Sequence, residues 1–570
     1  MNTTQKAAVK KIARLRDKAT EQYLEVIEFP ISKTSVNKLK LPPSVVSEPG
    51  AFGKRLRDAG AILPKGEEEL KKLLTSVAKS DPPEECVYEA QTGWTQDKKG
   101  FVLVDGVIGN AATKIIGVNQ ANSIDDPSGR LSRSGGWKSW RDTVAEQARL
   151  STILMFGISV ALAAPLLAII NRPSFSICLF GRTRVGKSIA TLLGASIIGI
   201  ARIDDLITWN IKDARLEERI SEFNDALFPI DDLSNMKGSD KEKYLRIRDV
   251  AYRISQGWST ARHSSFTAAH GGVHASWRSI LLTSSERSIR ELARAVKLER
   301  QHGEAVRLMD VPAVFDGLDH IFDRLPEDFD KGNFQDRKKD TFKNIADACE
   351  KNHGKAFRKY IKALIADRVE LKGYIEAKIA YFVEHVCDEF DGDVARDVAA
   401  KIGLFYAAGM LGIRCGLLPW GKADLLDALT KTYIGARDLL PDDGVAVRQG
   451  IETLRAKLRQ LPRISKKAAT VPGNHNIDGY RERRKKVNRY VIKRDAFNSL
   501  FASGTQRALV IEWLIQKRRI TLATAKTSAG APAPKPQGQF IWPNGKRRRS
   551  FQILWPRKPK VTKAANKKKD

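Results

Sequence analysis

The stretch Ser174-Phe-Ser-Ile-Cys-Leu-Phe-Gly-Arg-Thr-Arg-Val-Gly-Lys-Ser-Ile-Ala-Thr-Leu-Leu-Gly-Ala195 decides the fold. Its centre, Gly181 to Ser188, matches every fixed position of the pattern G-x-x-x-x-G-K-[ST]. An apolar strand is predicted immediately before this motif and a helix immediately after it, which is the setting that a phosphate-binding loop requires. The sequence therefore predicts a strand, a phosphate loop and a helix, the first unit of an α/β nucleotide-binding core.

Each position of this loop has a chemical reason. Gly181 and Gly186 are expected to adopt unusual backbone dihedrals, so that consecutive N–H groups point at a bound anion. Lys187 is expected to contact the β- and γ-phosphates, and the Ser188 hydroxyl to be a Mg²⁺ ligand. ATP with Mg²⁺ is thus the predicted cofactor, held by Gly181, Arg182, Thr183, Arg184, Val185, Gly186, Lys187 and Ser188.

A second candidate strand lies about 40 residues downstream and ends in two carboxylates. The segment Asn224-Asp-Ala-Leu-Phe-Pro-Ile-Asp-Asp places Asp231 and Asp232 after a short apolar run. We expect Asp231 to lie near Mg²⁺, and Asp232 to orient or deprotonate an attacking water. The alternative is an ordinary acidic cap at a strand end. Pro229 is awkward inside a central strand.

A third apolar run ends in hydroxyl groups. Trp277-Arg-Ser-Ile-Leu-Leu-Thr-Ser-Ser-Glu places Thr283 and Ser284 where they could contact the γ-phosphate or the attacking water. An ordinary strand-end role explains them equally well. A hairpin is predicted to turn at residues 271–272 just upstream. The three histidines around it are accompanied by no cysteine or carboxylate cluster, so a zinc site is disfavoured.

Charge and composition limit the partners and the compartment. The chain has 570 residues and a formal net charge of +32, and residues 481–570 contain 25 lysines and arginines against 4 aspartates and glutamates. This imbalance predicts a polyanionic partner, with a solvated basic tail as the alternative. The five scattered cysteines are typical of reduced thiols in a cytoplasmic protein. The uncharged stretch 153–170 favours a buried helix over a membrane span.

The remaining patterns predict four regions. Residues 1–140 are interpreted as an α+β domain, 141–330 as the ATPase core and 331–440 as a helical lid. Residues 441–570 show two apolar helical stripes followed by short strands, an outline typical of a winged-helix-like basic DNA-binding region. Residues 530–536 are the expected flexible wing tip, and the lysine-rich C-terminal end is the expected disordered tail.

From Gly93 to Tyr433 the order of several segments resembles a family of P-loop ATPases carried by mobile genetic elements, catalogued as a domain of unknown function (nine hundred and twenty-seven) and described as helicase-like. The shared segments are Gly93-Trp94, Ala163-Ala-Pro-Leu-Leu, the phosphate loop, Leu216-Glu217, Asn224-Asp225 with Asp231-Asp232, Thr260-Ala-Arg262, Trp277 with Ser284-Ser-Glu286, and Glu304-Ala-Val-Arg-Leu-Met-Asp-Val-Pro312.

The family looks related to the AAA+ class that includes the MCM replicative helicases. This resemblance implies a hexameric ring, in which Arg307 is similar to an arginine finger acting on the γ-phosphate of the neighbouring subunit. It also implies that the hairpin around Gly271 engages DNA and that Arg396 contacts nucleotide from the lid. Asp232 stands where the family usually has Glu, a departure that could slow hydrolysis.

These observations together predict an ATP-dependent DNA motor. We interpret the chain as an ATPase, namely a helicase for replication of a mobile element, acting on single-stranded or forked DNA as a homo-oligomer without a membrane anchor. The alternative is a DNA-binding AAA+ ATP switch, such as an initiator or a transposition or defence regulator, that hydrolyses slowly and unwinds nothing.

Overall fold

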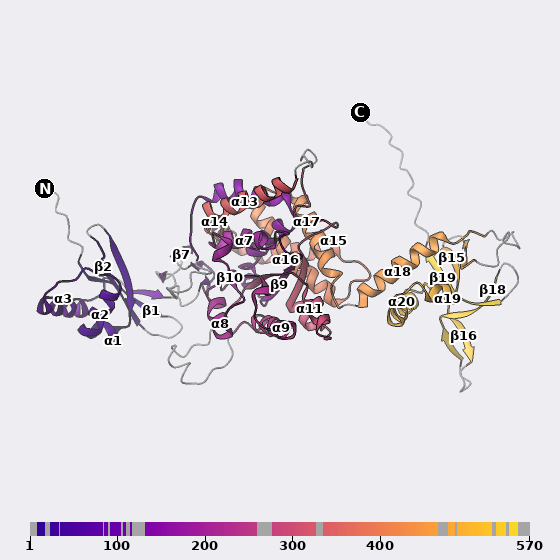
Figure 1. The fold of residues 1–570 in the computed structure, drawn as a ribbon, viewed down its shortest axis with the longest axis horizontal. Coiled ribbons are helices and arrows are strands. Elements are labelled where there is room, and N and C mark those ends of the chain that lie inside the picture. Colours follow the sequence, from indigo (N-terminus) through magenta and orange to yellow (C-terminus); the bar gives the residue numbers. More distant parts are fainter. Residues whose placement is uncertain are drawn as a thin grey trace, which may run out of the picture. The chain divides into compact units, whose positions relative to one another are not determined.

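The structure is a computed structural model, and the part of the chain that it describes falls into two compact units (Figure 1). The first unit contains Met1–Val386 and Asp397–Leu439, and the second contains Cys387–Arg396 and Leu440–Asp570. The described residues are 8–17, 23–32, 35–83, 85–88, 92–103, 106–109, 115–116, 131–258, 276–326, 334–441, 443–464, 477–484, 487–526, 532–542 and 547–556.

A five-stranded parallel sheet forms the centre of the first unit. Its spatial order is β10-β11-β12-β9-β13, and its strands are almost entirely buried apolar runs, as expected of a parallel sheet covered on both faces. The strands are β9 (Phe175–Phe180), β10 (Ile207–Thr208), β11 (Leu227–Asp231), β12 (Ile280–Ser285) and β13 (Leu308–Pro312).

Register places the three polar strand ends at one edge of this sheet. Ser285 lies beside Phe180, where the phosphate loop begins, and Thr283 lies beside Ile230, the residue before Asp231. One strand, β12, thus separates the loop from the aspartate. Pro229 is tolerated inside β11 because the short edge strand β10 pairs only with the two residues that follow it.

The predicted buried helix is confirmed. Helix α5 (Thr152–Ala163) is buried along its whole length and packs on α7 (Lys187–Ile198), the helix after the phosphate loop. A Cβ on Gly157 would lie 2.6 Å from the Ala190 carbonyl oxygen, so only glycine permits this close approach. Among the described residues, no helix combines the length and the apolar character that crossing a membrane requires.

Further helices surround the sheet. The helical period predicted for residues 340–440 is confirmed, and Phe405 of this region packs edge-on against Phe156 of α5. The helices are α4 (Trp137–Trp140), η1 (Arg141–Ala145), η2 (Ala148–Leu150), α6 (Leu166–Ile169), η3 (Ile203–Asp205), α8 (Asp213–Ser221), η4 (Leu233–Asn235), α9 (Asp240–Gln256), α11 (Ile289–Ala295), α12 (His302–Arg307), α13 (Phe334–Lys351), α14 (Lys355–Ala366), α15 (Arg368–Val386), α16 (Asp393–Arg414) and α17 (Lys422–Arg437).

Residues before the central sheet contain both strands and helices. One sheet has the order β3-β2-β1-β4-β8 and packs Phe29 against Phe52 and Leu56 of a helix, while a second small sheet has the order β5-β6-β7. The elements are β1 (Lys10–Asp17), β2 (Tyr23–Pro30), β3 (Val36–Leu41), α1 (Pro43–Ser47), α2 (Pro49–Asp58), α3 (Glu67–Lys79), β4 (Glu85–Tyr88), β5 (Gly93–Trp94), β6 (Gly100–Leu103), β7 (Gly106–Gly109) and β8 (Ile115–Ile116).

The second unit packs three helices on a four-stranded antiparallel sheet of order β14-β15-β19-β18. Both predicted apolar stripes lie in its core, where Phe497 stacks on Phe551 at 4.0 Å between ring centroids. The elements are α18 (Asp443–Gln460), β14 (Gly479–Arg483), β15 (Val487–Lys493), α19 (Arg494–Asn498), α20 (Gly504–Gln516), β16 (Ala523–Lys526), β17 (Pro532–Lys535), β18 (Gln537–Ile541) and β19 (Arg547–Pro556).

Three details of this unit differ from the prediction. Strands β14 and β15 were not expected from the sequence, and residues 532–535 of the predicted flexible wing tip form strand β17, which pairs with β16. Ile520, predicted to begin a strand, makes only an isolated bridge. The basic sequence of β14 and β15 obscured their alternating pattern.

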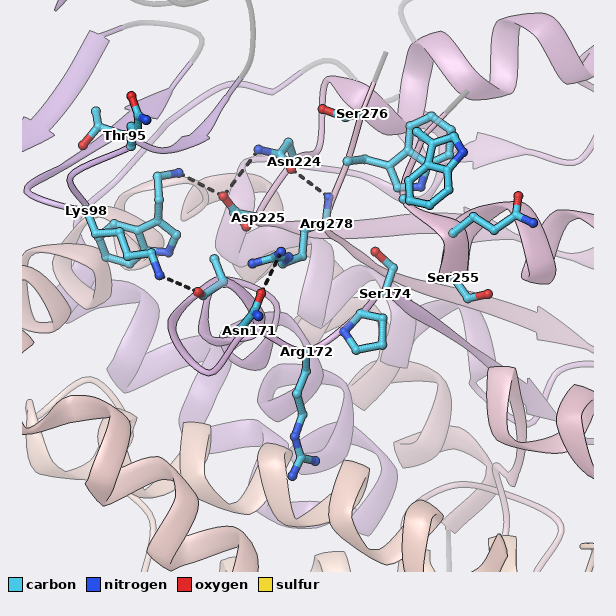
Figure 2. A pocket seen from close by; sticks show the side chains of 18 residues that line it. Thr95, Lys98, Asn171, Arg172, Ser174, Asn224, Asp225, Ser255, Ser276 and Arg278 are labelled. Carbon is cyan, nitrogen blue, oxygen red and sulfur yellow. Dashed lines mark hydrogen bonds between the residues drawn. The ribbon is translucent and has the colours of Figure 1, made fainter. Parts of the chain in front are cut away.

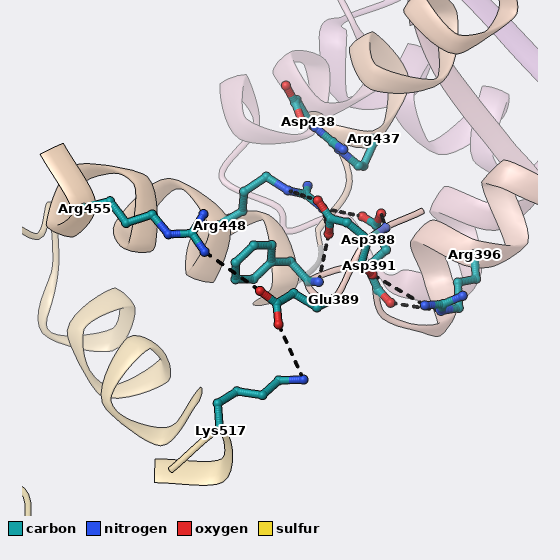
Figure 3. A network of polar contacts seen from close by, with 10 residues as sticks. Asp388, Glu389, Asp391, Arg396, Arg437, Asp438, Arg448, Arg455 and Lys517 are labelled. Carbon is teal, nitrogen blue, oxygen red and sulfur yellow. Dashed lines mark hydrogen bonds and ion pairs between the residues drawn. The ribbon is translucent and has the colours of Figure 1, made fainter. Parts of the chain in front are cut away.

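An acidic turn between α15 and α16 belongs to this second unit (Figure 3). Arg448 of α18 donates two hydrogen bonds to Asp388, at 2.7 and 3.3 Å, and one to Asp391 at 2.7 Å. Phe390, between these carboxylates, stacks on Trp513 with 5.1 Å between the ring centroids. The side chain of Asp391 is 1% exposed, so its charge depends on Arg448 for compensation.

Candidate nucleotide site

The loop between β9 and α7 closes around its second glycine. Gly186 has a φ of +115°, and a Cβ there would lie 2.7 Å from both Ile321 and Phe342. Arg184 also has a positive φ, of +64°. The expected unusual dihedral is not found at Gly181, whose φ is not positive and whose added Cβ would make ordinary contacts at 3.5 Å. The loop reverses at Arg184 and Gly186, so Gly181 needs no left-handed conformation.

Lys187 is held across the mouth of this loop. Its Nζ donates to the carbonyl oxygens of Gly181 at 2.7 Å and Arg182 at 2.9 Å. The residue is 8% exposed, and this burial lowers the pKa of the ammonium, while the nearby carboxylates of Asp232 and Glu286 oppose that shift. The amine therefore already lies at the loop where phosphate oxygens would bind.

Asp231 joins three elements at the carboxyl edge of the sheet. Its Oδ1 accepts a hydrogen bond from the Ser284 hydroxyl at 2.8 Å and one from the Ser188 hydroxyl at 3.2 Å. The Ser284 oxygen accepts in turn from the backbone N–H of Asp232 at 3.1 Å. Loop, β11 and β12 are thus connected by one short chain of hydrogen bonds, and Ser284 fixes the Asp231 carboxylate.

The donor set beside Lys187 fits Mg²⁺. Ser188 and Asp231 present a hydroxyl and a carboxylate oxygen side by side, and Mg²⁺ in nucleotide sites takes one or two such protein ligands and fills its octahedron with phosphate and water. No group of three or more His, Cys, Asp or Glu in the described part of the chain could hold a metal by itself. The site is therefore suited to a metal that arrives with a polyphosphate.

Asp232 has a different local role from its neighbour. It has a φ of +48° and begins the short 3₁₀ turn η4, where its carboxylate accepts a hydrogen bond from Ser234 N–H at 2.9 Å. This capping contact is the alternative that the sequence left open for strand-end acids. Its charge also opposes the lowering of the Lys187 pKa by burial.

Thr283 and Ser284 differ although they are adjacent. Consecutive side chains of a strand point to opposite faces of the sheet, so Thr283 does not share the direction of Ser284. Thr283 is fully buried, and its hydroxyl accepts a hydrogen bond from the indole N–H of Trp209 at 2.7 Å. Of the two hydroxyls, Ser284 is the one that the fold brings to Asp231.

Two residues at this site were not singled out from the sequence. Glu286, directly after β12, accepts a hydrogen bond from the Thr183 hydroxyl in the phosphate loop. Trp209 supports Thr283 from the neighbouring segment after β10. The available signal for Glu286 was its position, as a carboxylate one residue past a strand that ends in polar groups. For Trp209 the sequence indicates only that a buried indole N–H needs an acceptor, and it does not identify that acceptor.

Arg307 lies away from the loop of its own chain. It ends α12 and precedes Leu308, which pairs with Ser176 at the amino end of β9. Ser176 and Phe180 are four residues apart, about 13 Å along a strand that rises about 3.3 Å per residue. The guanidinium lies 4.8 Å above the Tyr252 ring and donates to its own helix at Gly303, at 2.7 Å. No carboxylate among the described residues pairs with it.

Of two other predicted features, Arg396 is located by the structure and the hairpin around Gly271 is not. Arg396 donates to the backbone carbonyl oxygens of Asp388 and Asp391, so the structure holds it in the acidic turn. The predicted hairpin around Gly271 and the three nearby histidines lie outside the described residues, which stop at Trp258 and resume at Ser276.

The fold and the loop define a mixed α/β protein with a P-loop sequence motif at the carboxyl edge of a parallel sheet. Residues 4–274 match the model of the family described as "Domain of unknown function (DUF927)", which confirms the family resemblance predicted from the sequence. The matched range includes the complete phosphate loop and both aspartates, whereas Arg307 and the helices after it lie beyond it.

A solved structure described as "SCCmec type IV Cch - active helicase" is similar to this chain in fold. The two share 15% sequence identity with a TM-score of 0.55, and the similarity covers 96% of this chain and 93% of that chain. No curated protein matches the sequence. At this identity the comparison shows a shared fold over nearly the full length of both chains.

Proposed function

We propose that this chain is an ATP-dependent DNA motor with an AAA+-type P-loop core, serving as a helicase in the replication of a mobile element. The observation that carries the proposal is the hydrogen bond between Ser188 and Asp231, which brings the loop and the acidic strand together at one edge of the sheet. A chance motif would have no reason to face a buried strand ending in a carboxylate. The fold shared with a mobile-element helicase supports the same conclusion.

The residues take distinct roles in this proposal. Backbone N–H groups from Gly181 to Gly186 and the Lys187 ammonium bind the phosphates of ATP. Ser188 and Asp231 would hold Mg²⁺, which would neutralise negative charge on the bound phosphates. Ser284 acts as a positioning residue, because its hydroxyl fixes the Asp231 carboxylate from the neighbouring strand.

We further propose that Arg307 acts on the nucleotide of a neighbouring subunit in a ring, which we infer to be a hexamer. The support is its location about 13 Å along β9 from its own loop. A half-buried guanidinium that has no described carboxylate partner is also available to an incoming phosphate. Head-to-tail association would bring the amino edge of one sheet to the carboxyl edge of the next.

The four regions predicted from the sequence remain our proposal for the domains: 1–140, 141–330 as the ATPase core, 331–440 as the lid and 441–570 as a winged-helix-like DNA-binding region. Helices packed on an antiparallel sheet in the second unit support the last of these. The basic strand β19, which begins with three consecutive arginines, supports a nucleic-acid surface there.

A second candidate is a DNA-binding ATP switch that hydrolyses slowly and unwinds nothing. The observation that favours it is the engagement of the Asp232 carboxylate with Ser234 N–H. A carboxylate that caps a turn is a poorer acceptor for the proton of an attacking water, and Asp is one methylene shorter than the Glu expected there. This candidate differs from the first in turnover and not in nucleotide binding.

The deciding experiment measures ATP hydrolysis and strand separation together. The full-length chain is tested with and without single-stranded DNA and on a forked duplex, beside Lys187→Ala and Asp231→Ala. A motor hydrolyses ATP faster with DNA and separates the fork, and both variants abolish both activities. Hydrolysis without strand separation would assign the switch. Loss of neither activity in Asp231→Ala would refute the proposed site.

A further inference from the structure

A cavity of about 560 Å³ opens at the amino edge of the central sheet, opposite the phosphate loop. Figure 2 shows residues from four segments converging on it. Ser174 precedes β9, Asp225 precedes β11, Arg278 precedes β12, and Lys98 belongs to the turn between β5 and β6. A cavity of this size is in the range of small-molecule and nucleotide pockets, and no role proposed above uses it.

The cavity is rich in positive charge. Lys98, Arg172 and Arg278 line it, against a single acidic lining residue, Asp225. Lys98 donates to the Ala168 carbonyl oxygen at 2.7 Å, and Arg278 donates weakly to Asn171 at 3.4 Å. Arg172 also lines the cavity, but Figure 2 shows its side chain extending away from the other labelled residues. The guanidinium of Arg278, which among the described residues has only this long hydrogen bond, is therefore the one available to an anionic ligand.

The acidic residue is buried and incompletely bonded. Asp225 is 5% exposed; its Oδ2 accepts from Trp94 N–H at 3.0 Å, whereas its Oδ1 has no hydrogen-bond partner in the described part of the chain. Burial raises its pKa to about 6, although Arg278 and Lys98 act in the opposite direction. An unpaired buried acceptor is costly, so a ligand that donates an N–H to it would gain affinity.

An aromatic surface completes the lining. Trp258 is 61% exposed, follows Gly257 at the end of α9, and lines the same cavity. Tryptophan is enriched at interaction sites because it combines a large apolar ring with a polar N–H. Beside cationic side chains it has the features of a stacking platform for an unpaired base.

We propose that this cavity binds one nucleoside phosphate unit of a single-stranded DNA. The phosphate is held by Arg278 with Lys98, the base stacks on Trp258, and a base N–H donates to Asp225 Oδ1. This inference deepens and rests on the proposed DNA motor, since it assigns part of its DNA contact to the ATPase unit. It is independent of the basic C-terminal region, which supplies charge but belongs to the other unit.

The test measures binding of a labelled single strand to the full-length chain by fluorescence anisotropy. Trp258→Ala should weaken binding by about 5-fold to 100-fold, the range expected for loss of one base stack. Tyr381→Ala, at an aromatic residue that is 48% exposed and outside the cavity, is the matched control and should bind as the unaltered chain does. On a strand carrying abasic sites throughout, Trp258→Ala should cause no further loss.

A second variant tests the phosphate contact separately. Arg278→Gln removes one proposed phosphate contact, so the slope of log affinity against log salt should fall by about 0.7. If both variants bind as the unaltered chain does, or if Trp258→Ala weakens intact and abasic strands equally, the cavity is not the site. A mononucleotide that binds the Lys187→Ala chain as tightly as the strand does, and that loses affinity when Trp258→Ala is added, would assign the cavity to a free nucleotide and overturn the strand assignment.

The two proposals can fail separately. If the unaltered chain hydrolyses ATP and binds the strand, and both cavity variants bind the strand equally well, only the cavity proposal is refuted. If the unaltered chain neither hydrolyses ATP nor binds the strand, both fall. Thermal unfolding of each variant checks its fold; Trp258 was chosen because it is largely exposed, and Arg278 because its side chain has only a long hydrogen bond among the described residues.

Discussion

The two glycines of the phosphate loop should respond very differently to alanine. At Gly186 an added Cβ meets Ile321 and Phe342 at 2.7 Å, and a φ of +115° is strained for any residue other than glycine. Such backbone strain costs about 1–3 kcal/mol, and forcing a methyl group into a packed site costs about 1–3 kcal/mol more. At Gly181 neither term applies, because its φ is not positive and the nearest atoms are 3.5 Å away.

We therefore expect Gly186→Ala to lose at least about 2 kcal/mol in total, equivalent to about 30-fold in an equilibrium constant. If the loop keeps its shape, the loss lowers the free energy of unfolding. If the loop relaxes, the loss appears in nucleotide affinity, because ATP must restore the strained shape. Thermal unfolding measures the loss in unfolding free energy, and titration with a fluorescent ATP analogue measures the loss in binding free energy. The prediction concerns the sum of these two losses.

Gly181→Ala is the matched control and should change either term by less than about 0.5 kcal/mol. Equal losses in the two variants would show that the strain does not reside at the second glycine. A total loss below about 0.5 kcal/mol for Gly186→Ala would refute the reasoning altogether, since both the dihedral and the contact would then be wrong.

Three further predictions concern buried polar groups. Arg448→Met should destabilise the second unit by about 3–5 kcal/mol in denaturant unfolding, because it leaves the buried Asp391 carboxylate unpaired. Arg455→Met is the control: it removes a long and partly exposed ion pair, so the ionic contribution lost should be only about 1 kcal/mol or less in the same assay. The stability of Asp225→Asn relative to the unaltered chain should increase as pH rises from about 4 to about 6. The raised pKa of Asp225 means that its protonated form stabilises the folded state, and the unaltered chain loses this contribution as the carboxyl ionises through this window. A difference in unfolding midpoint that does not depend on pH would contradict the prediction. Trp209→Phe should cost about 1–3 kcal/mol of unfolding free energy by leaving a buried hydroxyl without its donor, with nucleotide affinity unchanged in the same titration used for the loop variants.

The sequence predicted features that depend on local pattern. The phosphate loop, the buried helix before it and the acidic strand end are each encoded within about 20 residues, so periodicity and turn chemistry suffice to locate them. The expectation for Gly181 was wrong because a consensus pattern does not tell which of its glycines has the positive φ. That information depends on Ile321 and Phe342, which come from segments more than 130 residues away.

For contacts between strands, the sequence could predict which kinds of side chain lie near the site but not which residues bond to each other. The sequence offered Ser284 as a hydroxyl near the site, but its actual bond, to Asp231, depends on β12 lying between β9 and β11. The hydrogen bond from Thr183 to Glu286 arises from the same strand order. Strand order is set by the packing of helices on both faces of the sheet, and single-residue patterns do not report it.

The two edges of the parallel sheet divide the proposed functions between them. The carboxyl edge has the loop, Asp231 and Ser284, and the amino edge has Arg307 and the cavity at Trp258. Helix α9 contacts both features of the amino edge: its Tyr252 lies under the Arg307 guanidinium, and its last residue, Gln256, lines the cavity one helical turn later. A neighbour's phosphate that draws Arg307 off the Tyr252 ring would thus alter a helix that ends at the proposed DNA contact. Under the ring and cavity proposals, α9 would therefore connect hydrolysis in one subunit with DNA binding in the next.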